Sequence, residues 1–289
     1  MYKEKIMKKI IIYLSLVLSV IFNFGCCESK AEVSESIKVS LINRMGFIIY
    51  LEDNHVVVID GGFASDAPLL ELLLKNKIID AWFITHLHDD HVGAFNTLMV
   101  QGDLEVETIY YSKYSPNIYY TLEPQHNVKE TYEMFCSAIE NQNAVAVNTN
   151  DHIYIDGIDF HVILSGLDTI DEINDTSMIL KIEEYSVLFL ADATKREGEC
   201  LMEEHEEDLA SNIVQLGHHG GKSVSKDVYE KINPIVGIWS FDPDFVRTNK
   251  FFIEVKEWLD EIGVIYHINI ADQKKSVVVY KNGDFHIKR

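Results

Sequence analysis

Cysteine and proline are scarce in this sequence, with 4 and 5 residues among 289. Cys136 and Cys200 stand far apart and have no CxxC partner, so neither a disulfide framework nor a cysteine-rich metal site is indicated. The low proline count and the 15 glycines exclude a collagen-like or low-complexity chain. Because 47% of the residues are hydrophobic, the chain can bury a substantial core, which excludes intrinsic disorder as its main state.

Positive charge is also in short supply. Lys and Arg number 25 against 46 Asp and Glu, a formal net charge of −21. Without residues 1–26, which carry four lysines and one glutamate, 21 basic residues face 45 acidic ones and the net charge is −24. A surface this acidic repels polyanions, so we do not expect long nucleic acid as a partner. Solubility is the simpler reading of the acidity, and a local metal site could still hold one phosphate group.

The amino terminus has the layout of a secretory signal. Four lysines within residues 3–9 precede an apolar run over residues 10–24. That run is shorter than the roughly 20 apolar residues that a membrane-spanning helix needs. It ends at Gly25-Cys26, and a cysteine behind a small residue resembles a bacterial lipoprotein processing site.

The sequence therefore predicts a lipoprotein-like signal peptide over residues 1–26 and a tether over residues 27–36. Lipidation of Cys26 would anchor the remainder to the membrane, outside the cytoplasm. Asn23 stands where such sites usually carry leucine, so simple secretion and an uncleaved anchor remain alternatives. No other segment of the sequence is long and apolar enough to be expected to cross a membrane.

Strand-like and helix-like patterns alternate from Ile37 to the end of the chain. Runs of β-branched residues predict strands, and apolar residues spaced by three and four predict helices. The expected strands include 38–43, 46–52, 55–60, 81–85, 106–111, 152–164, 177–192, 212–220, 235–240, 264–270 and 276–287, and the expected helices include 67–77, 90–101, 128–142, 195–209 and 251–263. Two sheets packed face to face would satisfy this order. The predicted fold class is therefore α/β (α+β), a four-layer αββα sandwich of two mixed β-sheets flanked by helices, over residues 37–289.

The strongest chemical signal is the segment Thr85-His86-Leu87-His88-Asp89-Asp90-His91. It directly follows a buried strand, at the strand's carboxyl edge, where clefts form in α/β proteins. His86 and His88 alternate with a leucine and can face one point, while Asp90 and His91 open the next helix and can face a second. Imidazole and carboxylate are ligands for zinc, manganese or iron. A solvated polar turn is the alternative reading.

This HxHxDH segment resembles the metal-binding motif of the metallo-β-lactamase superfamily. Three further segments resemble that family in order and spacing: residues 58–62 (Val-Ile-Asp-Gly-Gly), residues 186–192, which end in Asp192, and residues 214–220, which contain His-His-Gly. Within the superfamily, the chain is most similar to the hydrolase domain of competence-type DNA-uptake proteins and their stand-alone relatives. The stretch Asn174-x-x-Ser177 supports that likeness, although Gly221 stands where those proteins usually have serine.

The resemblance implies a pair of divalent metal ions, most simply zinc, with manganese as an alternative. The implied ligands are His86, His88 and Asp192 for one ion and Asp90, His91 and His218 for the other, with Asp192 bridging the two. Asp90 would also accept a proton, and His219 would orient the substrate or donate a proton. Other family members complete the first ion with a further histidine, but His126, His152 and His161 stand in no matching motif.

A hydrolase that uses a hydroxide activated by two metal ions is the function that the resemblance implies. The expected substrate is a phosphodiester or another phosphoester, small or short, and located outside the cytoplasm. Two alternatives remain open at this point: a non-catalytic, metal-containing surface module that binds a ligand, and a lactone or amide hydrolase of the same superfamily. The sequence does not indicate an oligomeric state.

Overall fold

The computed structural model describes residues 35–43, 45–102, 104–221, 223–241, 247–269 and 276–288. The predicted signal peptide, Cys26 and all but the last two residues of the predicted tether lie outside this part of the chain, so those expectations stay predictions. In the part that the structure describes, no helix has the length and apolar character that a membrane span requires.

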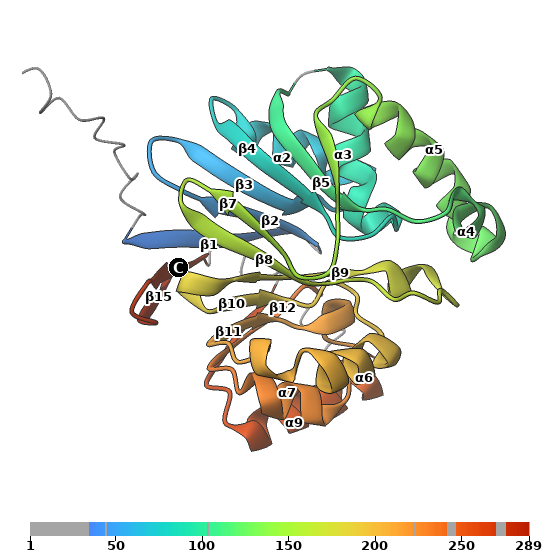
Figure 1. Cartoon of the computed structure of the whole chain (residues 1–289). Helices are drawn as coiled ribbons and strands as arrows, with labels where there is room; N and C mark the ends of the chain where they lie inside the picture. The colour runs from blue at the N-terminus through green and yellow to red at the C-terminus, as the bar shows by residue number, and fades with distance from the viewer. Residues whose placement is uncertain are drawn as a thin grey trace, which may run out of the picture. The chain divides into compact units, whose positions relative to one another are not determined.

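Two β-sheets form the centre of the unit that begins at Ser34 (Figure 1). Within the described residues, the first sheet has eight strands in the order β15 (Phe285–Lys288), β14 (Ser276–Tyr280), β1 (Ser36–Asn43), β2 (Gly46–Tyr50), β3 (His55–Asp60), β4 (Ile78–Ile84), β5 (Val106–Ser112) and β6 (Ala144–Val147). It is antiparallel from β15 to β3 and parallel from β3 to β6.

The second sheet has seven described strands. Their order is β13 (Tyr266–Asn269), β12 (Val236–Trp239), β11 (Ile213–Gln215), β10 (Val187–Phe189), β9 (Met178–Ile182), β8 (Ile158–Ser165) and β7 (Asp151–Ile155). This sheet is also mixed, with parallel pairing from β10 to β13 and antiparallel pairing from β7 to β10.

Helices cover the outer face of each sheet, as Figure 1 shows. The first sheet carries α2 (Ala67–Leu74), α3 (Asp89–Gln101), α4 (Pro116–Thr121) and α5 (Val128–Ile139), and the second carries α6 (Lys195–Glu204), α7 (Lys226–Ile232) and α9 (Lys250–Ile262). Short 3-10 turns join these elements: η1 (Ala64–Asp66), η2 (Pro124–His126), η3 (Ile173–Thr176), η4 (Glu183–Tyr185), η5 (Glu206–Asp208) and η6 (Gly217–Gly220). The predicted four-layer αββα sandwich is confirmed.

Aromatic side chains link the layers. Between the sheets, Phe47 of β2 packs edge-on against Phe189 of β10, with ring centroids 5.2 Å apart. Under the helices of the first sheet, Trp82 of β4 meets Phe95 of α3 at 5.0 Å. Because β4 is covered on both faces, its residues are almost all apolar instead of alternating with polar ones. The strand that leads into the HxHxDH segment is therefore rigidly embedded.

Element boundaries differ from the expectations at a few places. The helix expected over 195–209 ends at Glu204 and continues as the separate turn η5. Glu203, Glu204, Glu206 and Glu207 lie at that end, where the negative pole of the helix dipole disfavours carboxylates. Helix α4 and strand β6 were not expected from the sequence.

Candidate metal centre

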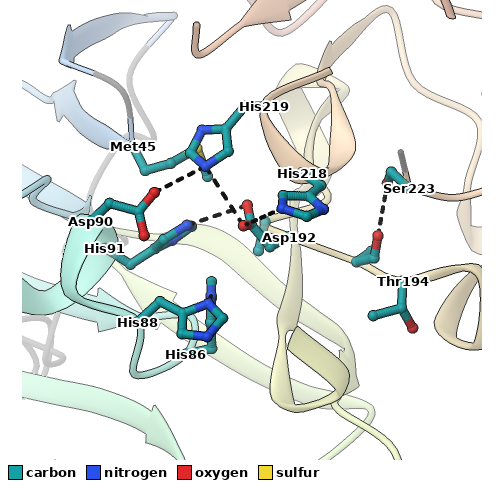
Figure 2. A network of polar contacts seen from close by, with 12 residues as sticks. Met45, His86, His88, Asp90, His91, Asp192, Thr194, His218, His219 and Ser223 are labelled. Atoms are coloured by element: carbon teal, nitrogen blue, oxygen red, sulfur yellow. Dashed lines mark hydrogen bonds and ion pairs between the residues drawn. The ribbon is translucent and has the colours of Figure 1, made fainter. Parts of the chain in front are cut away.

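The polar residues of the sequence motifs meet at one edge of the two sheets. The loop after β4 carries His86 and His88, and the first turn of α3 carries Asp90 and His91. The loop after β10 carries Asp192, and the turn η6 after β11 carries His218 and His219. Figure 2 shows these side chains converging from both halves of the sandwich. The edge at which strands end in loops is where α/β folds place their clefts.

Two overlapping groups of potential ligands lie there. The ligand atoms of His86, His91 and Asp192 lie within 4.8 Å of one another, and so do those of Asp90, His91 and His219. His91 belongs to both groups, so the two positions are adjacent. The side chains come from segments more than a hundred residues apart, and all except Asp90 are nearly inaccessible to water.

The separations within these groups fit divalent cations. His91 Nε2 lies 3.2 Å from Asp192 Oδ1, and His219 Nε2 lies 3.1 Å from Asp90 Oδ2. Two ligands of one tetrahedral ion, with bonds of about 2.0–2.1 Å, are separated by about 3.3 Å. His91 Nε2 and Asp192 Oδ1 are buried, and each has no polar partner closer than the other at 3.2 Å, which leaves room for a cation between them. The residues present therefore fit a metal centre.

Asp60 holds the shared ligand His91 in place. Its Oδ2 accepts a hydrogen bond from His91 Nδ1 at 2.8 Å, and the backbone N–H and the hydroxyl of Thr85 donate to the two carboxylate oxygens. A carboxylate on one ring nitrogen turns the other, Nε2, toward Asp192, an arrangement common behind metal-bound histidines. The sequence analysis did not assign Asp60 this role. The sequence offered one indication of it: Asp60 is a single acidic residue at the end of an apolar strand, directly before Gly61-Gly62.

His88 lies next to the first group. Its Nδ1 is 3.1 Å from Nε2 of His86, and its Nε2 is 2.9 Å from Oε2 of Glu123, which comes from the turn η2. Like Asp60, Glu123 is a residue of the site that the sequence analysis missed. It stands in no motif and lies 35 residues from the histidine that it contacts.

Protonation states in the centre are set by burial and by neighbouring charges. Burial, together with the charges of nearby histidines, lowers the pKa of His86 well below its usual value, so this imidazole is neutral. For His91, burial acts in the same direction, but the carboxylates of Asp192 and Asp60 outweigh it and raise the pKa well above the usual value. Burial opposes ionisation of Asp90, yet its hydrogen bond with His219 holds the pKa below the usual range.

A cavity of about 680 Å³ opens onto these groups. Asp90, Asp192 and His219 form its floor, and Glu123 and Asn174 belong to its walls. This volume suits a small organic molecule.

The two neighbouring histidines of η6 lie differently. His219 is buried, with Nε2 3.1 Å from Asp90 and 3.6 Å from Asp192. The side chain of His218 is 42% exposed, and its Nε2 lies 3.7 Å from Asp192 Oδ2. Of the two, only His219 joins a compact ligand group. The sequence-based choice of His218 as the ligand stays a prediction, but the geometry favours His219.

The three histidines that the sequence analysis weighed as a further ligand of the first ion occupy different places. His126 lines the cavity, with its ring centroid 6.1 Å from that of His88. His152 and His161 stack on each other across β7 and β8, and each contacts a carboxylate, Asp159 or Glu183. Neither of these two lines the cavity, as the sequence analysis anticipated when it found no matching motif for them.

A model of the Metallo-beta-lactamase superfamily matches residues 43–233, which is more than half of the chain. The chain belongs to this superfamily. The matched segment includes all residues of the two ligand groups, so the family resemblance seen in the sequence is confirmed at this level. The superfamily assignment also supports the metal-binding reading of the site.

Matches to individual curated superfamily proteins are short. Hydroxyacylglutathione hydrolase from Aliivibrio fischeri (strain MJ11) is 43% identical over 56 residues, which cover 19% of this chain and 21% of that protein. The corresponding protein from Aliivibrio salmonicida is 45% identical over 56 residues. The matched region spans only about a fifth of these relatives.

Two solved structures share the fold over most of the chain. Igni18, a metallo hydrolase from Ignicoccus hospitalis, has a TM-score of 0.50 and 14% identity, covering 84% of this chain and 98% of its own. CmlA, a diiron β-hydroxylase from Streptomyces venezuelae, has a TM-score of 0.51 and 12% identity, covering 81% of this chain and 53% of its own. At such identities the likeness concerns the fold alone.

Proposed function

We propose that this superfamily member is a hydrolase that holds two divalent metal ions and cleaves a phosphodiester or another phosphoester of a small or short substrate. One observation carries the proposal. Imidazole and carboxylate atoms from distant segments, among them His91 Nε2 and Asp192 Oδ1 at 3.2 Å, lie within 4.8 Å of one another beside a cavity of about 680 Å³. Zinc is the metal that the donor set suits best, with manganese as the alternative.

When bound, the two ions would supply an activated water and a Lewis acid for hydrolysis. The chain's own residues would bind the ions and orient the substrate. We assign His86 and Asp192 to one metal position and Asp90, His91 and His219 to the other, since these atoms already lie within ligand distance of one another. His91 belongs to both groups, but with Nδ1 bonded to Asp60 it offers only Nε2 and would bind one ion. His218, more exposed and on the cavity wall, is then the histidine best placed to contact a substrate.

Charge and cavity size support a small substrate over a long polymer. The net charge of −21 opposes the approach of a polyanion, and 680 Å³ admits only a small molecule or the end of a chain. The likeness to competence-type hydrolase domains supports a phosphoester as the substrate. We therefore expect slow cleavage of long duplex DNA even with both metals present.

Hydrolysis of an acyl compound is the second candidate. The short match to hydroxyacylglutathione hydrolase favours it, because part of the chain is 43% identical to a protein of that name. The same metal centre would serve either reaction, since in both a water attacks a carbon or phosphorus whose oxygens can be stabilised by cations.

A substrate panel tests the proposal and separates the candidates. The purified chain without residues 1–26 is loaded with zinc or manganese and assayed on a phosphodiester, a phosphomonoester, a lactone, hydroxyacylglutathione and long duplex DNA. Turnover of the small phosphoesters supports the proposal. Turnover of the lactone or hydroxyacylglutathione alone favours the second candidate, and ligand binding without any turnover indicates a non-catalytic module.

His86→Ala and Asp192→Asn are expected to lower turnover of the active substrate by more than about 100-fold, beyond the usual effect of substitutions behind the ligands. His152→Ala is the matched control, because His152 lies on β7 outside the cavity. Metal content measured by mass spectrometry accompanies each assay. Full activity in either ligand variant, or in the metal-free protein, would contradict the proposal.

The location outside the cytoplasm, with a lipid anchor on Cys26, is part of the same proposal. It is supported by the basic head, the apolar run and the small residue before the cysteine. Fractionation of cells expressing the full chain should find it with the membranes, and Cys26→Ser should abolish incorporation of a labelled fatty acid. Unchanged labelling of the Cys26→Ser chain would refute the anchor.

A further inference from the structure

Glu123 connects two segments that border the first metal position. Its Oε2 accepts a hydrogen bond from His88 Nε2 at 2.9 Å, and its Oε1 accepts one from the backbone N–H of Ile173 at 2.8 Å. The side chain is largely shielded, with 18% exposed. One carboxylate thus joins the HxHxDH loop to η3, segments that are 85 residues apart in sequence.

The backbone around Glu123 is held in an unfavourable conformation. Glu123 has φ of 49° and Asn127 has φ of 52°, so non-glycine residues in the left-handed region flank the short turn η2. For a residue such as glutamate this conformation is disfavoured and persists only where surrounding contacts impose it. Here the strained turn delivers the Glu123 carboxylate to His88 and Ile173.

The contact with Glu123 determines which nitrogen of His88 is available. A carboxylate only accepts hydrogen bonds, so the proton of a neutral His88 resides on Nε2 and the lone pair on Nδ1. Nδ1 is the nitrogen that faces His86 Nε2, at 3.1 Å. This is the separation expected for two imidazoles that share one ion. Without Glu123, the ring could rotate or change tautomer.

The contact with Ile173 bears on the opposite wall of the cavity. Ile173 is fully buried, and the next residue, Asn174, lines the cavity with its Oδ1 buried and without a hydrogen-bond partner. The hydrogen bond from Ile173 to Glu123 therefore fixes the segment that presents the side-chain amide of Asn174 beside the metal position.

We propose that Glu123 is a positioning residue for the first metal position, which fixes His88 as a metal ligand through Nδ1 and at the same time holds the η3 wall in place. This inference rests on the proposed function, since it concerns binding of the metal ions. Its importance follows from the ligand set. At this position His86 and Asp192 leave room for a further ligand, and His88 can supply it only in one ring orientation.

Glu123→Gln separates this role from mere packing. A glutamine has the same shape but a single acceptor oxygen, so it cannot accept from both His88 and Ile173. Glu123→Ala removes both contacts. Titration of metal-free protein with Co²⁺, followed by its visible absorption and by competition with a chelating dye, gives the affinity of each site and the coordination geometry.

Both variants are expected to weaken one of the two binding steps by about 10- to 100-fold, as for other residues behind metal ligands, and to change the Co²⁺ spectrum. The second step should keep its wild-type affinity. Glu130→Gln is the matched control, since it removes one negative charge from an exposed position on the neighbouring helix α5 and should behave as wild type.

Far-ultraviolet circular dichroism of the metal-free variants shows whether they fold, and Glu123→Gln decides the question if Glu123→Ala does not. Wild-type affinities and an unchanged spectrum in folded Glu123→Gln would overturn the positioning role while leaving the proposed function intact. A wild-type chain that binds no Co²⁺, Zn²⁺ or Mn²⁺ would overturn both.

Discussion

At the residue scale, Glu197 is a buried acid that belongs to neither ligand group and does not line the cavity. Glu197 lies in the first turn of α6, where its Oε2 accepts a hydrogen bond from the backbone N–H of Thr194 at 2.8 Å. Its Oε1 is buried without a hydrogen-bond partner. Burial raises the pKa of Glu197 well above its usual value, and the charges of Asp175 and Asp192 add to this while the Thr194 contact opposes it.

A raised pKa in the folded state makes stability fall as pH rises. Below the unfolded value of 4.5, Glu197 is protonated in both states and costs nothing. Above it, the unfolded chain ionises first, and each pH unit up to the folded pKa costs about 1.4 kcal/mol. Glu197→Gln keeps an acceptor for Thr194, so we expect it to raise the free energy of unfolding of the metal-free protein by about 1–3 kcal/mol at pH 7.

Urea unfolding of both proteins at several pH values measures this difference. The gain should shrink toward zero as the pH falls to 4.5, since Glu197 is then neutral in the folded and unfolded states alike. A gain that did not depend on pH would show that the substitution acts through packing and not through the charge of Glu197.

At the element scale, the turn η6 depends on a glycine that no other residue can replace. His218 and His219 have φ of 47° and 61°, and Gly220 follows at 92°. A Cβ on Gly220 would lie 2.4 Å from the ring of Trp239, which is itself buried between the second sheet and α9. Any side chain here must push the turn, and with it His219, away from Asp90.

Gly220→Ala should therefore weaken metal binding as well as stability. Gly102, the residue after α3, has φ of 75° with open space around it, so Gly102→Ala introduces the backbone strain alone. We expect Gly102→Ala to lower the free energy of unfolding by about 1–2 kcal/mol and to leave metal affinity unchanged. Gly220→Ala should lower the free energy of unfolding by about 1–3 kcal/mol more, because of overpacking, and should also lower metal affinity. Equal effects of the two substitutions on metal titration would contradict this account.

The turn η6 also shows what could be predicted from the sequence and what could not. The fold was predictable, because the period of the apolar residues and the order of the elements allow few layer arrangements. The HxHxDH ligands were predictable because they are close in sequence. The choice between His218 and His219 depends instead on the left-handed backbone of η6, which no pattern in the sequence records. His219 consequently faces Asp90, whereas the sequence favoured His218.

Contacts between residues that are far apart in the sequence could not be predicted either. Asp60 lies 31 residues from His91, and Glu123 lies 35 residues from His88. Asp60 lies in the family-like segment 58–62 but had no role assigned to it, and Glu123 lies outside every motif. Only the folded arrangement shows that these two acids contact histidines. Residues that orient ligands were therefore found from the structure and not from the sequence.

At the scale of the described fold, the metal centre joins the two halves of the sandwich. His86, Asp90 and His91 belong to the half built on the first sheet, whereas Asp192 and His219 belong to the half built on the second. His91 and Asp192 meet across this boundary as a buried pair. Bound cations would add bonds to both halves that the unfolded chain cannot form.

Removal of metal should therefore lower thermal stability. A ligand present at 100 times its dissociation constant stabilises the folded state by about 2.7 kcal/mol per site. For a domain of this size, 1 kcal/mol corresponds to roughly 2–4 °C, so filling even one site should raise Tm by about 5–10 °C. Scanning calorimetry of the zinc-loaded protein before and after dialysis against a chelator measures the shift. Asp192→Asn removes a ligand carboxylate from one of the two metal positions, so its Tm should respond less to the chelator than that of the wild type, whereas His152→Ala should respond as wild type. A chelator effect of equal size in Asp192→Asn would mean that the stabilising ions bind elsewhere, and the two halves would then be held together by packing alone.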